Sequence, residues 1–271
     1  MRPSEHVLDL FAVPGDLEPV PGGPGHRVRA GDLVLSPGRD PVALDALNPV
    51  LARLAVDLDT RAHRYRRDLR VAMPVPARDG RWAVEGLGAS RFEPGTRLLT
   101  DLPATRAVGA ILHAELAAVV PHRPAAGTDR DDRWGRAERL AFACPPGGRG
   151  PGGVVIPLVD RLWAIRDDTP LGPDGLVHGD LMGNVLLDHD GAPLVIDVSP
   201  YWRPALWAEA TCVLDAVLWW DADPGAIGSW VNGPARQAMV RAGLFRLLGD
   251  PSPDVDAYER ALAPVLGWLH A

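Results

Sequence analysis

The sequence predicts an α+β fold of two lobes, a small β-rich N-terminal lobe and a larger, mainly helical C-terminal lobe. Three observations lead to this prediction. Residues 1–100 alternate short strand-like runs with one long helical pattern, helical periodicity dominates after residue 100, and a polar hairpin motif interrupts those helices at residues 176–200. A chain of 271 residues suits one large domain or two small ones that share a cleft. We expect residues 1–88 and 89–271 to be the two lobes.

The N-terminal lobe reads as strand, strand, helix, strand, strand after a short first helix. Ser4 can cap that helix over 6–13, and Pro14-Gly15 stops it. Two pairs of strand-like runs flank turn residues, 26–30 with 33–36 and 69–75 with 81–85. A helical pattern covers 42–58, and the glycine-containing segment 86–95 is typical of a connector.

The C-terminal lobe begins with a helix that presents one apolar face, formed by Val108, Ile111, Leu112, Leu116 and Val119. Residues 121–133 and 145–153 are rich in proline, glycine and charge, so we expect loops there. Helical patterns cover 134–144 and the region around 158–165.

Composition excludes several classes of function. The net charge of −7 argues against general nucleic-acid binding, which requires a basic surface. No segment resembles a signal peptide or the ~20 apolar residues of a membrane span, so we expect a cytoplasmic protein. The two cysteines show no metal-ligand spacing. All 28 basic residues are arginine, so any role that needs a lysine ammonium must be filled otherwise or is absent.

The most informative segment is the hairpin motif. Its strand-like runs 184–188 and 193–197 are joined by His189-Asp190-Gly191-Ala192. If this four-residue turn pairs Asp188 with Pro193, Asn184 faces Asp197 at the open end, with side chains ~5 Å apart. Asp180 lies just upstream.

This arrangement of oxygen ligands suits magnesium–nucleotide chemistry. Mg²⁺ prefers hard oxygen ligands, and one further carboxylate can accept the proton of an attacking hydroxyl. A single Asn or Asp at a hairpin end is more often an ordinary turn cap. Three such residues beside His178 favour the functional interpretation.

The segment His178-Gly179-Asp180, with Asn184 and Val195-Ile196-Asp197, resembles the catalytic loop and metal-binding segment of aminoglycoside phosphotransferases and choline kinases, which are relatives of protein kinases. The chain is most similar to an uncharacterised actinobacterial branch of this group. The two-lobe order extends the likeness over nearly the whole chain, whereas the motif covers only 176–200. Family members have five positions from the aspartate to the asparagine, and this chain has four.

The resemblance implies a protein-kinase-like fold that binds Mg²⁺ and ATP or GTP. Asp180 would be the catalytic base and His178 an orienting loop residue, while Asn184 and Asp197 would bind the metal. Residues 1–88 would cover the nucleotide, and residues 89–271 would carry catalysis and the small-molecule acceptor. Asp215 would hold the catalytic loop from a helix, although a solvent-facing carboxylate is equally compatible with the sequence.

The nucleotide-binding part of the likeness has a gap. Gly22, Gly23 and Gly25 could let backbone N–H groups approach phosphates, although a plain turn fits equally well. The family's phosphate-binding lysine is replaced by Ser36, and its partner glutamate falls near Asp45. Either Arg27 and Arg29, two residues apart on the preceding strand, supply the missing charge, or nucleotide binding is weak.

Other residues have less specific patterns. Gly88 and Ser90 lie in a segment that would face adenine as a hinge, or would form a flexible linker. His113 is expected to be a packed or surface histidine. Tyr201, just past Asp197, could wall the acceptor site, although most aromatic residues should be core.

Three functions remain open at this point. The first is a small-molecule phosphotransferase, and the second is a kinase-like pseudoenzyme that binds a nucleotide or metabolite. The third, a metal-dependent phosphoesterase, fits less well because the further His and Asp ligands of a two-metal site are missing. The expected partners are a nucleotide and a small-molecule acceptor, with no nucleic acid and no membrane. Nothing in the residues chooses the acceptor, ATP over GTP, or an oligomeric state.

Overall fold

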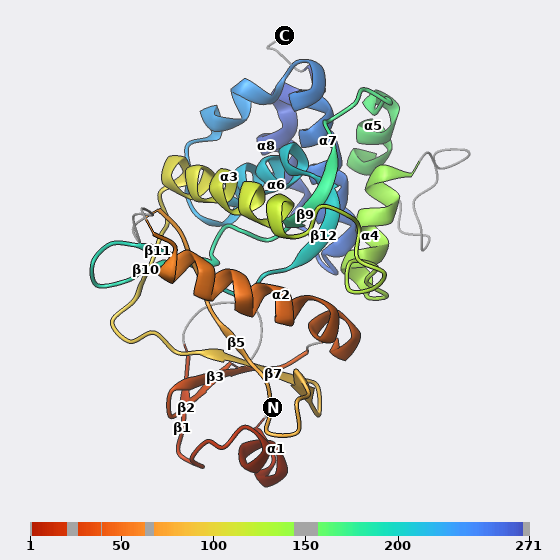
Figure 1. Ribbon diagram of the computed structural model, residues 1–271. Coiled ribbons are helices and arrows are strands. Elements are labelled where there is room, and N and C mark those ends of the chain that lie inside the picture. Colours follow the sequence, from red (N-terminus) through yellow and green to blue (C-terminus); the bar gives the residue numbers. More distant parts are fainter. Residues whose placement is uncertain (1, 21–26, 39, 63–67, 144–156, 268–271) are drawn as a thin grey trace. The chain divides into compact units, whose positions relative to one another are not determined.

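The computed structural model describes residues 2–20, 27–38, 40–62, 68–143 and 157–267 (Figure 1). These residues form two compact units. The sheet unit comprises Met1–Leu99, Ala114–Thr128 and Gly183–Pro200, and the helical unit comprises Thr100–His113, Asp129–Met182 and Tyr201–Ala271. Each unit is assembled from several segments of the chain, so the division at residue 88 into nucleotide-covering and catalytic lobes stays a prediction.

The larger sheet of the sheet unit has the strand order β1-β2-β3-β7-β5, with β6 paired to β7. Its strands are β1 (Leu17–Pro19), β2 (Val28–Ala30), β3 (Leu33–Ser36), β5 (Pro74–Val75), β6 (Ala83–Val84) and β7 (Leu87–Arg91). Helix α1 (Glu5–Leu10) begins as expected at Ser4, whose side chain accepts a hydrogen bond from the Val7 amide. Val7 packs with Leu33 and Leu35 in the core beneath this sheet.

Two expectations for the N-terminal strands are wrong. The segment expected to be a connector contains β7, which pairs with β3, β5 and β6. The runs 69–75 and 81–85 do not pair with each other, because β5 and β6 both pair with β7 and β4 (Arg70–Val71) pairs with β11 (Pro193–Val195). The physical reason is that Gly88 has no side chain and Ala89 only a methyl group, which allows β7 to be buried between its neighbours. Glu85 and Gly86, both with positive φ, turn the chain from β6 into β7.

A second sheet of the same unit carries the hairpin motif. Its order is β4-β11-β10-β8, made of β4 (Arg70–Val71), β11 (Pro193–Val195), β10 (Val185–Leu187) and β8 (Arg97–Leu98). Helix α2 (Pro41–Thr60), capped by Asp40, packs against β4 and β5 and appears in orange in Figure 1.

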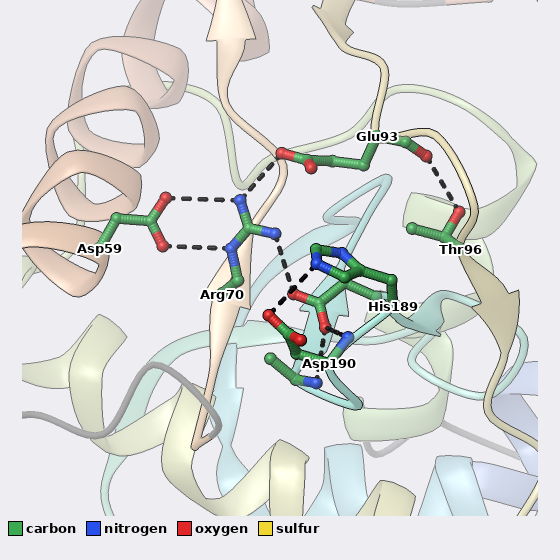
Figure 2. Close-up of polar contacts among 8 residues, drawn as sticks. Asp59, Arg70, Glu93, Thr96, His189 and Asp190 are labelled. Atoms are coloured by element: carbon green, nitrogen blue, oxygen red, sulfur yellow. Dashed lines mark hydrogen bonds and ion pairs between the residues drawn. The ribbon is translucent and has the colours of Figure 1, made fainter.

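Arg70 ties this second sheet to its surroundings (Figure 2). Its guanidinium contacts Asp59 of α2 at 3.1 Å, Glu93 at 2.9 Å and Asp188 of the hairpin turn at 3.3 Å. Burial opposes the charge, yet Asp59 and Glu93 raise the pKa of Arg70 above its ordinary value. One cation therefore fixes the hairpin that bears Asn184 and Asp197.

The helical unit is built around α7 (Gly233–Gly249), which is buried at every residue from 237 to 247. It packs against α4 (Arg133–Phe142), α5 (Pro157–Ile165), α6 (Ala205–Trp219) and α8 (Val255–Leu266). The unit also contains the short helix η1 (Pro224–Trp230), the strand pair β9 (Asp174–His178) and β12 (Pro200–Pro204), and residues 102–113 of α3 (Leu102–Val119). None of the described helices is long and apolar enough to cross a bilayer.

Candidate active site

The loop after β9 is fixed by two histidines of the helical unit. His178, the last residue of β9, is fully buried, and its backbone amide donates to Nε2 of His113 on α3 at 3.3 Å. The backbone amide of Asp180 donates to Nδ1 of His178 at 3.1 Å. Both acceptor nitrogens must therefore be unprotonated. His178 thus orients the loop backbone.

His113 helps to fix the loop after β9, a role that the sequence did not reveal. Burial, with a smaller effect from His178, lowers its pKa to about 4, so its ring is neutral at pH 7 and can accept the bond. The expectation of a packed histidine is correct. The contact with His178 depends on a residue 65 positions away, and no local pattern in α3 announces it.

Gly179 rests on the ring of Tyr201. A Cβ atom at this glycine would lie 2.5 Å from a ring carbon of Tyr201, so no other residue fits without movement. Tyr201 is itself buried and packs edge-on against Trp207 and Phe245, with ring centroids 5.4 and 5.6 Å away. Tyr201 thus packs against Gly179 of the loop. Nothing in the described residues supports the expectation that it lines an acceptor site.

Asp180 is held from α7. Nη2 of Arg246 lies 2.7 Å from Oδ1 of Asp180, and Nε of Arg246 lies 2.7 Å from Oδ1 of Asp215 on α6. Asp215 is buried, as the functional interpretation of its apolar surroundings implies. Burial raises the pKa of Asp215 to about 6 against the lowering effect of Arg246, so the carboxylate is ionised at pH 7. Asp215 reaches the loop through Arg246, a residue that the sequence reading missed.

The hairpin forms with a register that differs by one residue from the predicted one. Leu187 pairs with Pro193, and the amide of Ile196 donates to the carbonyl of Asn184 at 3.0 Å. The cause is Asp188, whose side chain accepts from the amides of Asp190 and Ala192 and so closes a shorter turn. Asn184 therefore lies opposite Ile196, with Asp197 one residue beyond.

Asp197 adopts a strained backbone conformation. Its φ of 49° lies in the left-handed region, which residues other than glycine seldom occupy. Such strain costs on the order of 1–3 kcal/mol and tends to persist at functional sites. The conformation is an observation in favour of a role for Asp197.

Arg27 is the cation that reaches Asp197. Its Nη1 lies 2.6 Å from Oδ2 of Asp197, and the Arg27 side chain is 8% exposed. Arg29 does not make this contact. Its guanidinium pairs with Glu18 at 3.1 Å and lies 4.3 Å from the centre of the Phe92 ring. Of the two arginines proposed from the sequence, the structure brings Arg27 to the acidic residue.

The register of β2 and β3 explains why Arg27 can take this position. Val28 pairs with Leu35 and Arg29 with Val34, so continuing the antiparallel ladder by one residue places Arg27 opposite Ser36. Directly opposed residues share a face of the sheet. Arg27 therefore points from the neighbouring strand toward the region that a side chain at position 36 would occupy.

A pocket of the sheet unit joins several of these residues. Ser36, Gly88, Ser90 and Asp197 line it, together with Asn48 of α2. The predicted glutamate equivalent, Asp45, is exposed, whereas Asn48, three residues further along α2, is buried. Ser36 and Asn48, which are both uncharged, thus line the pocket. Gly22, Gly23 and Gly25 lie outside the described residues.

The ligand chemistry of the hairpin end fits a magnesium ion. The Asn184 side-chain amide and the Asp197 carboxylate are hard oxygen donors, of the kind Mg²⁺ uses beside phosphate oxygens and water. Within the described ranges, no three His, Cys, Asp or Glu residues gather into a metal-binding cluster. The two-metal phosphoesterase alternative gains no support.

Comparison with known proteins establishes the fold. No protein-family model and no curated protein sequence match the chain. The choline kinase LicA from Streptococcus pneumoniae is similar in structure, with a TM-score of 0.54 at 11% identity over 97% of both chains. LicA in complex with AMP is similar with a TM-score of 0.50 at 10% identity, over 93% of this chain and 92% of that one. The chain therefore has the fold of kinase-like small-molecule phosphotransferases, which confirms the fold class predicted from the sequence.

Proposed function

We propose that the protein transfers the γ-phosphate of ATP or GTP to a hydroxyl group of a small molecule, in the cytoplasm. In this reaction a bond forms between the acceptor oxygen and the γ-phosphorus, and the bond from that phosphorus to the β,γ-bridging oxygen breaks. The hydroxyl proton passes to the Asp180 carboxylate, and a nucleoside diphosphate leaves. Positioning and charge neutralisation carry most of such catalysis.

The predicted residues, apart from Arg29 and the three glycines Gly22, Gly23 and Gly25, each have a defined part in this proposal. Asp180 orients the acceptor hydroxyl and accepts its proton, and His178 fixes the loop that carries Asp180. Asn184 and Asp197 hold Mg²⁺, which neutralises phosphate charge when it is bound. Gly88 and Ser90 contact the nucleotide from β7.

The observation that carries the proposal is the contact between Arg27 and Asp197. A nucleoside triphosphate needs a cation near its phosphates, and Ser36 cannot supply one. Arg27 lies across the ladder from Ser36 and already contacts the proposed metal ligand, Asp197. We therefore propose that Arg27 replaces the lysine, which supports an active enzyme over the pseudoenzyme alternative.

The test is a thermal-shift panel of ATP and GTP, with and without Mg²⁺, on three proteins. A ligand at a thousand times its Kd stabilises a protein by about 4 kcal/mol, so a real site gives a clear shift. We expect magnesium-dependent stabilisation of the wild type that Arg27→Ala abolishes. Arg29→Ala is the matched control, because it removes the same charge only two residues further along the chain, and it should respond like the wild type.

Two outcomes would contradict the proposal in different ways. Equal nucleotide responses of Arg27→Ala and Arg29→Ala would show that Arg27 is not the phosphate-binding cation. Nucleotide stabilisation of the wild type without diphosphate formation, across a panel of hydroxyl compounds and water as acceptors, would instead favour the pseudoenzyme.

A further inference from the structure

Arg246 joins the proposed catalytic base to the interior of the helical unit. We propose that Arg246 is a positioning residue, which fixes the Asp180 carboxylate in the orientation that receives the acceptor proton. This inference rests on the proposed function, since it assigns Asp180 as the base. It adds a residue that lies 66 positions from Asp180 and outside the motif that identifies the loop.

The contacts of Arg246 cover both the loop and the helix behind it. Its Nη2 lies 2.7 Å from Oδ1 of Asp180 and 3.4 Å from the carbonyl oxygen of Gly179. On the other side, Nε lies 2.7 Å from Oδ1 of Asp215, and Nη2 also contacts the second oxygen of Asp215. One guanidinium therefore bridges a loop carboxylate and a helix carboxylate.

Burial differs sharply between the two carboxylates. The side chains of Arg246 and Asp215 are 4% and 2% exposed, whereas that of Asp180 is 36% exposed. The Asp180 side chain is thus partly exposed, while its Oδ1 contacts the buried Arg246. Although burial opposes its charge, Asp215 and Asp180 raise the pKa of Arg246 above its ordinary value, so it stays a cation.

Aromatic rings restrict the guanidinium further. Its central carbon lies 5.3 Å from the ring centre of Trp134, 4.9 Å from that of Phe245 and 5.6 Å from that of Trp219. A planar, five-donor group can satisfy two carboxylates in such surroundings, which a lysine ammonium cannot reproduce. The orientation of Asp180 is therefore set by packing in the core, and loop residues alone do not determine it.

A purely structural role would make Arg246 no more than the counter-charge of Asp215. The double variant Asp215→Leu/Arg246→Met separates the two roles. It replaces both charges of the buried pair by apolar side chains, a change that is often neutral for stability. Arg246→Met alone would instead leave the buried Asp215 carboxylate without its cation. The double variant also removes the contact with Asp180.

Three measurements on the full chain decide between the roles. These are thermal stability, ATP affinity by thermal shift, and diphosphate formation from Mg²⁺–ATP with water or an acceptor found by screening. We expect the double variant to keep the stability and ATP affinity of the wild type while its kcat falls about 10²-fold, the effect of a displaced catalytic group.

Arg241→Met is the matched control. Arg241 is a second buried arginine of α7, and its hydrogen bonds go to Gln237 and to the backbone of Asp167. Its loss should lower stability without a specific loss of kcat.

The results separate this inference from the proposed function. A double variant that is folded and retains wild-type kcat would overturn the positioning role. A wild type that neither responds to nucleotide nor forms diphosphate would overturn the proposed function instead. Crystal structures of the wild type and the double variant then decide the inference, which fails if the Asp180 carboxylate keeps the same rotamer in both.

Discussion

Replacing His113 should change how stability depends on pH. His113 accepts a hydrogen bond from the backbone of His178 with a neutral ring, and burial lowers its pKa to about 4. In the unfolded chain a histidine has a pKa near 6.5. Between these values the unfolded chain binds one more proton than the folded protein, so acid favours unfolding. The stability that this site contributes is complete above about pH 6.5 and declines as the pH falls toward 4.

The size of the effect follows from the two pKa values. They are about 2.5 pH units apart, and each unit corresponds to about 1.36 kcal/mol, so this site should cost about 3 kcal/mol across the window. Asp215 acts in the opposite direction, because burial raises its pKa to about 6 and the folded state then binds its proton more readily. Asp215 is unchanged in a His113 variant, so the difference between wild type and variant isolates His113.

The assay is urea unfolding, followed by tryptophan fluorescence at several pH values between 7.5 and 4.5. His113→Gln retains an oxygen that can accept the amide bond but does not titrate. The free energy of unfolding of the wild type should fall relative to that of His113→Gln by about 2 kcal/mol as the pH drops from 6.5 to about 4.5. His189→Gln is the control, because the side chain of His189 is 79% exposed. A wild-type and His113→Gln pair that shows the same pH dependence would refute the reasoning.

Two further predictions concern the supports of the candidate site. Arg70→Met leaves three carboxylates facing one another and should lower the free energy of unfolding by about 2–4 kcal/mol in urea titrations. Arg78→Met, at a side chain 63% exposed, should cost less than about 1 kcal/mol, and equal losses would contradict the account. Gly179→Ala forces a Cβ atom against Tyr201 and should lower both the melting temperature and diphosphate formation. Gly191→Ala, where φ is +80° but nothing lies within 4 Å, should cost only about 1 kcal/mol and leave turnover intact, so a Gly179→Ala enzyme of normal turnover would be inconsistent with the loop contact.

Local patterns predicted the elements better than their partners. The strand Leu33–Ser36 and the cap at Ser4 follow from alternation and from side-chain hydrogen bonding within a few residues, and both form as expected. The segment 86–95 failed because glycine favours turns in isolation, whereas at Gly88 it allows a buried strand. The hairpin was predicted, but its register was wrong because the Asp188 side chain closes the turn one residue earlier.

Residues that act over long sequence distances could not be found in this way. The residues next to Arg246 in the sequence of α7 are apolar. They give no indication that Arg246 contacts Asp180 and Asp215. Asn48 was missed because residues three positions apart lie on the same side of a helix, and the sequence does not show which of Asp45 and Asn48 lines the pocket. The sequence did contain one general signal for each residue, since Arg246 is a basic residue between apolar neighbours and Asn48 is a polar residue in an apolar stripe.

The pairing of Arg27 with Asp197 bears on how inactive members of enzyme families are recognised. A comparison made position by position with the family that the sequence resembles finds serine at position 36 in place of lysine. On that ground alone the chain would be classed as inactive. In an antiparallel sheet, however, the directly opposed residue on the adjacent strand projects from the same face. The long side chain of an arginine can span the roughly 4.7–4.9 Å between the two strands. Before an enzyme is classed as inactive, the residue that lies opposite on the adjacent strand should therefore also be checked for a positive charge.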